Sequence, residues 1–492
     1  MNCLIDNPAK KCNEHDFLAH LPKTSLDLQL KSRKPRWGWP ELLLSSLSHA
    51  YPGRPIMTEF FPQELVNAII DEVRDFNDLK ACSLTCRNFS SHSRALLFQE
   101  LKLDGRPAYR DAFQRFHDFC VVSPHIPSLV QTFCIHGYHR SHSPHPGADT
   151  VNSILQFMRN LKVIKFYDVT SFTDFCDGSM ARLPSHSFRE IHLYDVFFLE
   201  NGFDHICAIL QGSPNLQRLF VHHTGPMALP MFGGDETSRP RLDHTHATHH
   251  GPPIRDLSVV SKYDYKCPAF IEAILETRTC PLSINELQRF AFSLSESIDF
   301  QHLGEMLTLT SGTLRVLSLT FNFPNASRDL PLDSLPIVGI GHLSKVAFMI
   351  TYGRDGPYYL RWWIQSLKKV IACDETPALR VMDLELGPSF SLANPAAQPE
   401  WNEFDQILSS PPFDDGFRAL TIQVQKRSSD EHVNQWDESP LALPSESVLG
   451  GATPHRSVEV RAKHLKAQFP RLAGKGKLSI KIIHQSEAGY AM

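Results

Sequence analysis

The sequence of 492 residues contains no long apolar run. Apolar stretches such as 42–44 and 196–199 fall far short of the about 18 consecutive apolar residues that a membrane-spanning helix needs. The N-terminus also lacks the apolar core of a secretory signal, because Asp6, Lys10 and Glu14 interrupt it. We therefore expect neither a membrane span nor export.

Neither sign of charge dominates, since 49 Lys and Arg side chains face 53 Asp and Glu side chains and the formal net charge is −4. This balance gives no global attraction to polyanions, so we expect neither nucleic acid nor a membrane as a partner. The 11 cysteines have no paired spacing, which indicates free thiols in a reducing compartment. We expect an intracellular protein, cytoplasmic or nuclear.

Catalytic motifs are also missing: the sequence has no G-x-S-x-G elbow, no H-E-x-x-H pair and no Walker loop. Histidines gather in segments 136–145 and 244–250, but the surrounding Ser, Pro, Thr and Gly indicate loops. A zinc site needs four ligands on a rigid tetrahedral frame. We therefore expect no metal, no cofactor and no enzymatic activity, with an unrecognised enzyme in the second part of the chain as an alternative.

The composition is that of an ordinary globular protein, with 42% hydrophobic and 21% charged residues. Residues 1–57 are polar and punctuated by proline, which predicts an N-terminal tail without sustained structure. From Pro62 onward, apolar residues at helical spacing predict three short helices, the second of them capped by Asn77 or Asp78. So short a unit has little core of its own.

Beyond the helices, an apolar pattern h-x-x-h-x-h recurs after stretches of helical periodicity. From Leu161 onward, successive starts lie between 27 and 38 residues apart. Alternating helices and short strands predict an α/β fold with a parallel sheet, and the repeat favours a solenoid. The occurrences are Phe98-Leu101-Leu103, Leu161-Ile164-Phe166, Phe188-Ile191-Leu193, Leu216-Leu219-Val221, Ile254-Leu257-Val259, Leu287-Phe290-Phe292, Leu314-Leu317-Leu319, Leu343-Val346-Phe348, Leu379-Met382-Leu384 and Phe417-Leu420-Ile422.

Two resemblances follow from these patterns. The repeats of residues 106–492 resemble degenerate leucine-rich repeats, although most spacings exceed the usual 20 to 29 residues. Residues 58–105 resemble the F-box, especially the fungal form. The matching residues are Phe61-Pro62-x-Glu64-Leu65, Ile69-Ile70-x-x-Val73, Leu79-x-x-Cys82-Ser83-Leu84-x-Cys86-Arg87-x-Phe89 and Leu97-Phe98. Phe61 stands where the family usually has Leu and Phe89 where it usually has Trp; both keep a large apolar group, so we expect the fold to be kept.

The F-box resemblance implies a function. In that family the box binds a Skp-family adaptor, which links it to a cullin and a ubiquitin-conjugating enzyme, and many members carry leucine-rich repeats that bind a target protein. For each residue, packing inside the chain is the alternative to adaptor contact; for the whole protein, the alternative is an interaction scaffold outside ubiquitination. The implied adaptor contacts are Phe61, Pro62, Leu65, Ile69, Leu79, Leu84 and Cys86.

Within the repeats, the residues between the apolar positions point away from the core, because side chains alternate along a strand. In the early repeats they include aromatic residues and histidines, which are common in interaction surfaces. They form the predicted target-binding surface, with an ordinary solvated face as the alternative: Lys165, Tyr167, His192, Tyr194, Phe220 and His222.

One charged segment lies near the C-terminus, where eight Lys and Arg are accompanied only by Glu459, a local charge of about +7. We interpret it as the polar exterior that a terminal repeat needs, with attraction of an acidic partner as the alternative. The basic residues are Arg456, Arg461, Lys463, Lys466, Arg471, Lys475, Lys477 and Lys481.

Overall fold

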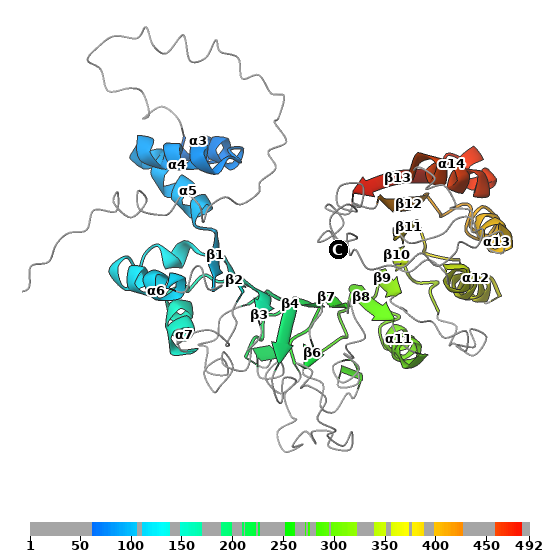
Figure 1. Ribbon diagram of the computed structural model, residues 1–492, viewed down its shortest axis with the longest axis horizontal. Helices are drawn as coiled ribbons and strands as arrows, with labels where there is room; N and C mark the ends of the chain where they lie inside the picture. Colours follow the sequence, from blue (N-terminus) through cyan, green and yellow to red (C-terminus); the bar gives the residue numbers. More distant parts are fainter. Residues whose placement is uncertain are drawn as a thin grey trace, which may run out of the picture. The chain divides into compact units, whose positions relative to one another are not determined.

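A computed structural model of the chain (Figure 1) shows three helices followed by a long parallel sheet. The predicted tail, 1–57, and Phe61 lie outside the described residues. The structure describes residues 62–105, 111–137, 148–169, 188–198, 209–210, 212–222, 225–226, 251–260, 271, 274–275, 282–294, 297–321, 339–350, 356–372, 376–387, 398–426 and 458–484.

The three helices are α3 (Gln63–Asp71), α4 (Phe76–Thr85) and α5 (Arg87–Leu97). Asp75 caps α4, and its Oδ1 accepts hydrogen bonds from the next helix's backbone N–H groups at 2.8 and 3.2 Å. The predicted caps Asn77 and Asp78 were wrong, because these residues donate those bonds from inside the first turn. Three helices therefore form where predicted, with the second beginning earlier than its proposed caps.

Over the described residues, the sheet has 13 strands and all its pairings are parallel. Apart from the short β6 (Gly225–Pro226), which pairs with β4, the strands lie in sequence order. This arrangement confirms the predicted α/β class and is compatible with the predicted solenoid. The strands are β1 (Glu100–Asp104), β2 (Thr132–His136), β3 (Val163–Val169), β4 (Glu190–Phe198), β5 (Arg218–His222), β7 (Asp256–Val260), β8 (Arg289–Leu294), β9 (Val316–Phe321), β10 (Lys345–Ile350), β11 (Val381–Leu386), β12 (Ala419–Lys426) and β13 (Leu478–His484).

Helices connect many of the strands and follow one face of the sheet (Figure 1). Parallel neighbours require such crossovers, because the chain must return to the same end of the sheet. The described connecting helices are α6 (Ala112–Val122), the short 3₁₀ helix η3 (Pro127–Leu129), α7 (Ala148–Phe157), α11 (Ser297–Leu309), α12 (Gly356–Ala372), α13 (Gln398–Leu408), α14 (Val458–Gln468) and α15 (Pro470–Gly474).

Side-chain alternation places the core between the strands and these helices. In β10, Val346, Phe348 and Ile350 are buried, whereas Lys345, Ala347 and Met349, which alternate with them, are half-buried. The in-register pairing repeats this order from strand to strand, so the apolar positions form one continuous hydrophobic core. The other side of the sheet, which carries the intervening residues, is called the opposite face below.

Aromatic side chains fill the core where α12 packs on the sheet. Trp362 and Trp363 are fully buried, with ring centroids 5.0 Å apart in an edge-to-face arrangement. Trp363 also lies 5.2 Å from Phe348 of β10, and Trp362 lies 5.3 Å from Phe300 of α11. Large rings that contact neighbouring repeats stabilise the stacking of one repeat on the next.

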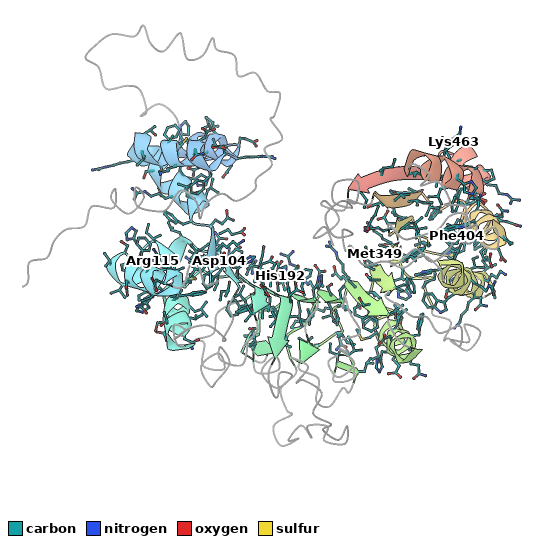
Figure 2. The ribbon with its side chains drawn as sticks, in the orientation of Figure 1. Asp104, Arg115, His192, Met349, Phe404 and Lys463 are labelled. Atoms are coloured by element: carbon teal, nitrogen blue, oxygen red, sulfur yellow. The ribbon has the colours of Figure 1, made fainter. Side chains whose placement is uncertain are left out.

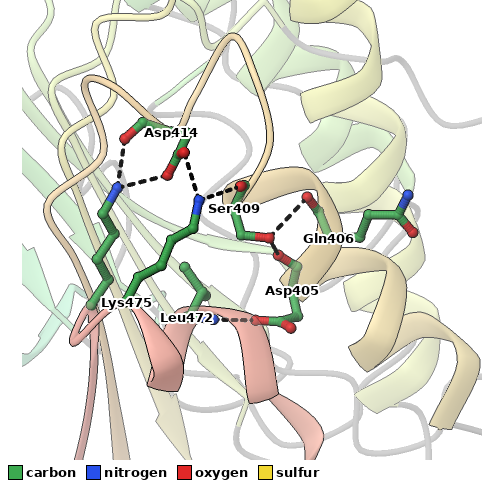
Figure 3. Close-up of polar contacts among 7 residues, drawn as sticks. Asp405, Gln406, Ser409, Asp414, Leu472 and Lys475 are labelled. Carbon is green, nitrogen blue, oxygen red and sulfur yellow. Dashed lines mark hydrogen bonds and ion pairs between the residues drawn. The ribbon is translucent and has the colours of Figure 1, made fainter.

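The carboxylates of Asp405 and Asp414 connect their repeat to the C-terminal repeat (Figure 3). The buried carboxylate of Asp405 on α13 accepts hydrogen bonds from the backbone N–H groups of Arg471 and Leu472, each at 3.0 Å. These N–H groups lie in the first turn of α15, where no helical partner exists for them. Asp414 pairs with the ammonium groups of Lys475 at 2.5 Å and Lys477 at 3.0 Å.

Nine of the ten predicted apolar patterns coincide closely with a strand from β3 to β12, and Phe98-Leu101-Leu103 with β1. The prediction missed β2, although Val130, Phe133 and Ile135 fit the pattern and are buried. It also missed β13 as a member of the series, because Lys475 occupies the first apolar position there. Lys475 lies before β13, and its ammonium group pairs with Asp414.

Candidate functional site

Over the described residues, the three-helix unit has a core of three buried apolar side chains, Val66, Ile70 and Leu79. Val73, Phe89, Leu96 and Leu97 are partly buried and pack against this core. A hydrogen bond of 2.7 Å between His92 of α5 and Asp71 of α3 links the first and third helices. Such a small core buries proportionally little surface, so the unit is only marginally stable by itself.

Several large apolar side chains of this unit are exposed. Leu65 and Leu84 are each 52% exposed, Ile69 is 47% exposed and Phe76 is 41% exposed. Leu65 and Ile69 lie one turn apart on α3, beside the face that buries Val66. We call these exposed side chains, together with the exposed Pro62, the apolar helix surface: Pro62, Leu65, Ile69, Phe76 and Leu84.

The structure separates the candidate adaptor residues into groups. Pro62, Leu65, Ile69 and Leu84 lie on the apolar helix surface, whereas Leu79 lies in the core and Cys86, between α4 and α5, is half-buried. Leu79 is therefore a packing residue, the alternative that periodicity left open. The sequence prediction missed Phe76, whose only signal was a large apolar residue directly after the cap Asp75.

The predicted target-binding residues lie side by side on the opposite face of β3, β4 and β5. In the register of the sheet, Tyr167 pairs with Tyr194, and Tyr194 pairs with His222. His136 of β2, which the prediction did not include, extends this row because it pairs with Tyr167. Four ring-bearing residues from four consecutive strands therefore form the ring row: His136, Tyr167, Tyr194 and His222.

The rings of this row stack closely on one another. Tyr167 and Tyr194 have centroids 4.9 Å apart and planes inclined by only 5°. His136 stacks on Tyr167 at 4.4 Å, and His222 meets Tyr194 edge to face at 4.8 Å. These separations match the spacing of neighbouring strands, so in-register pairing itself produces the stack. The rings of this row thus contact one another, and Nε2 of the buried His222 also lies 2.7 Å from the Ser258 hydroxyl oxygen.

A second row lies two residues earlier, where Lys165, His192 and Phe220 pair across the same strands. The His192 ring (Figure 2) stacks on Phe220 with centroids 4.3 Å apart and planes inclined by 9°. Its Nε2 lies 2.5 Å from Oε1 of Glu190, and its Nδ1 lies 3.1 Å from the Tyr194 hydroxyl. Glu190 also forms an ion pair with Arg218 on β5.

This network has one consistent protonation pattern. Burial lowers the pKa of His192 below its ordinary value, despite the opposing effect of Glu190, so the ring is neutral at pH 7. Because a carboxylate only accepts, Nε2 carries the proton and Nδ1 accepts from the Tyr194 hydroxyl. Burial raises the pKa of Glu190, but the hydrogen bond from His192, the charge that His192 carries when protonated and the charge of Arg218 outweigh burial and lower it. The network thus fixes the orientation of the His192 and Tyr194 rings.

A residue with left-handed backbone directly follows the ring row in three of these four chain segments. Gly137, Asp168 and Asp195 have φ of 60°, 55° and 51°. Asp168 and Asp195 lie between paired positions in β3 and β4, and the following valines, Val169 and Val196, are buried again. Both strands carry this residue in register, and it shifts the alternation by one residue so that the following valine faces the core. The sequence signal is the repeated Tyr-Asp-Val at 167–169 and 194–196.

The opposite face changes character toward the C-terminal strands, where rings give way to carboxylate and amide groups. Lys345 pairs with Asp383 at 2.7 Å, and the Gln425 side-chain amide donates to Glu385 at 2.6 Å. Burial raises the pKa of Glu385, opposed by that hydrogen bond. The ring-bearing residues therefore mark one part of the sheet, strands β2 to β5, as a distinct surface.

Over the described part of the chain, no group of three or more His, Cys, Asp or Glu could hold a metal ion. Of the two histidine segments, only His136 lies within the described residues. Among the helices that the structure describes, none has both the length and the apolarity to span a bilayer.

Comparison with models of known protein families and with curated proteins found no match.

Proposed function

We propose that this chain is the target-recognition subunit of a Skp–cullin–F-box type ubiquitin ligase. The observation that carries the proposal is the exposure of Leu65, Ile69 and Leu84 on a three-helix unit with a three-residue core. These are positions where the F-box resemblance implies contact with a Skp-family adaptor. Exposed apolar surface on so small a unit favours a partner that covers it.

The sheet supports the second half of the proposal. The ring row and the His192 network form a rigid platform of Tyr, His and Phe side chains, a composition typical of protein interaction surfaces. Because neighbouring rings and hydrogen bonds fix the platform, binding a target would cost little side-chain entropy. In this proposal the repeats, leucine-rich-repeat-like in sequence, bind the target, and the chain contributes position rather than catalysis to ubiquitin transfer.

The test is co-purification of the full chain with a recombinant Skp-family adaptor. Replacing Leu65 and Ile69 together by Ser removes apolar area that the adaptor would cover, so we expect affinity to fall about tenfold or more. Neither side chain belongs to the three-residue core, so the fold should survive. The matched control replaces Val121 and Val122, equally exposed on α6, by Ser and should leave adaptor binding unchanged.

The alternative function is an interaction scaffold outside ubiquitination. It predicts that the wild-type chain captures a target protein but no adaptor, and that the Leu65 and Ile69 variant behaves like wild type. Absence of adaptor binding by the wild-type chain would therefore reject the ligase proposal. Equal loss in the variant and the α6 control would show a nonspecific effect of removing apolar surface, which also counts against it.

A further inference from the structure

The last strand of the sheet, β13, has one described neighbour. It pairs in parallel with β12 from Leu478 to His484, and over the described residues no strand lies on its other side. An unpaired strand edge presents a row of backbone N–H and C=O groups, which is a template for another extended segment. The edge is seven residues long, longer than many strands in globular proteins.

The register shows which backbone groups are available. Leu420 pairs with Leu478, and its N–H donates to the Lys477 carbonyl at 2.8 Å. In a parallel ladder, alternate residues direct both backbone groups to the same neighbour. The odd-numbered residues of β13 therefore bond to β12, whereas the N–H and C=O groups of Leu478, Ile480 and Ile482 point away from the sheet.

The side chains of this edge alternate between apolar and polar. Leu478 and Ile480 are half-buried against the main core, and Ile482 is 40% exposed. Ser479 and Lys481 lie on the opposite face and are exposed. An added strand that matched this order would have apolar residues beside Ile480 and Ile482 and a residue of complementary charge beside Lys481.

The charge of the last repeat is positive and partly unpaired. Asp414 pairs with Lys475 and Lys477. The exposed Lys463, Lys466, Arg471 and Lys481 form no ion pair with any described carboxylate. These side chains belong to α14, α15 and β13, so one repeat carries both the available edge and the uncompensated cations.

We propose that β13 accepts an extended, acidic segment of a partner protein, which continues the sheet as an additional strand. Backbone hydrogen bonds from Ile480 and its even-numbered neighbours supply affinity, and the cations of α14, α15 and β13 select acidic side chains. A second copy of this chain is a poorer occupant, because edge-to-edge pairing brings two such cationic repeats together. The proposal does not depend on adaptor binding.

The test uses the full chain and a fluorescent peptide of alternating valine and glutamate, about seven residues long, the length of a strand. Fluorescence anisotropy should show saturable binding that weakens as salt rises, because exposed charges are screened. Ile480→Pro removes an outward N–H without touching the ladder to β12, so we expect affinity to fall about tenfold or more. Lys481→Glu should weaken binding through charge reversal.

Two controls separate backbone pairing from packing and folding. Ile480→Ala shortens the side chain but keeps the N–H, and should retain clearly more affinity than Ile480→Pro. A peptide with alternate amides N-methylated loses its own donors and should not bind the wild-type chain, whatever the folding of the proline variant. Equal binding of a valine and lysine peptide, full binding by Ile480→Pro, or a wild-type dimer abolished by Ile480→Pro would each overturn the proposal.

Discussion

Replacing Glu190 by Gln tests whether the charged network of Glu190, His192 and Arg218 stabilises β4 and its neighbouring strands. Glu190 is buried, its carboxylate accepts from Nε2 of His192 at 2.5 Å, and it pairs with Arg218. Glu190→Gln keeps the size and one acceptor oxygen while removing the charge. The substitution therefore isolates the charge of the network from its packing.

The expected cost follows from the bonds that change. A hydrogen bond to a charged group contributes about 1.5–3 kcal/mol and a neutral one about 0.5–1.5 kcal/mol. The Arg218 side chain is about half exposed, so solvent screens its ion pair, which adds at most about 1 kcal/mol. We expect Glu190→Gln to destabilise β4 and its neighbours by about 1–2 kcal/mol at pH 7.

The pH dependence has a definite sign. The folded chain lowers the pKa of Glu190, so this stabilisation is present above the unfolded pKa of about 4.3 and disappears as pH falls through the folded value. Folding also lowers the pKa of His192. As the pH falls, this histidine therefore becomes protonated in the unfolded chain at a higher pH than in the folded chain. Below the unfolded histidine pKa of about 6.5, acid therefore begins to destabilise the network at His192, before Glu190 titrates.

Hydrogen exchange of peptides covering β3 to β5, compared between variants at the same pH, measures the local opening free energy. The Glu190→Gln difference from wild type should be present at pH 7 and should vanish at a pH where wild-type Glu190 is protonated. Glu403→Gln, which alters an exposed pair with Lys368, is the control and should change exchange little. A Glu190→Gln effect of equal size at both pH values would refute the electrostatic reasoning.

Two further predictions concern backbone groups. Asp405→Ala leaves two N–H groups at the start of α15 without their acceptor, which should lower the free energy of unfolding by about 1–3 kcal/mol per donor. Urea denaturation should show this loss. The control Asp415→Ala changes an exposed residue and should leave the free energy of unfolding unchanged. Gly137→Ala places a side chain on a left-handed residue and should cost about 1–2 kcal/mol. Gly312→Ala meets open space and is the control; equal melting temperatures for the two glycine variants would contradict the strain argument.

The in-register parallel sheet explains why the sequence predicted the face on which Tyr167, Tyr194 and His222 lie. A strand's side-chain period is two, so the position of each residue relative to the apolar pattern determines its face. Tyr167, Tyr194 and His222 occupy the same place in consecutive repeats, and parallel pairing brings them together. His136 escaped the prediction only because β2 was not recognised, since three apolar residues at this spacing are common in any globular sequence.

The apolar helix surface was less predictable, because an amphipathic helix specifies a face but not what that face contacts. Leu65 and Val66 are adjacent and equally apolar, yet one is half exposed and the other is buried. Leu79 and Leu84 share α4 and also divide between core and surface. The choice depends on how three helices pack against one another, which no local pattern encodes.

By itself, the sequence determined most of the strands and their two faces, because these follow from the alternation of side chains along a strand. Tertiary structure alone decided which apolar side chains remain outside the three-helix core. It also placed Arg218 beside Glu190 and left the edge of β13 without a described neighbour. These features arise between segments distant in sequence, where the energy depends on contacts that periodicity does not describe.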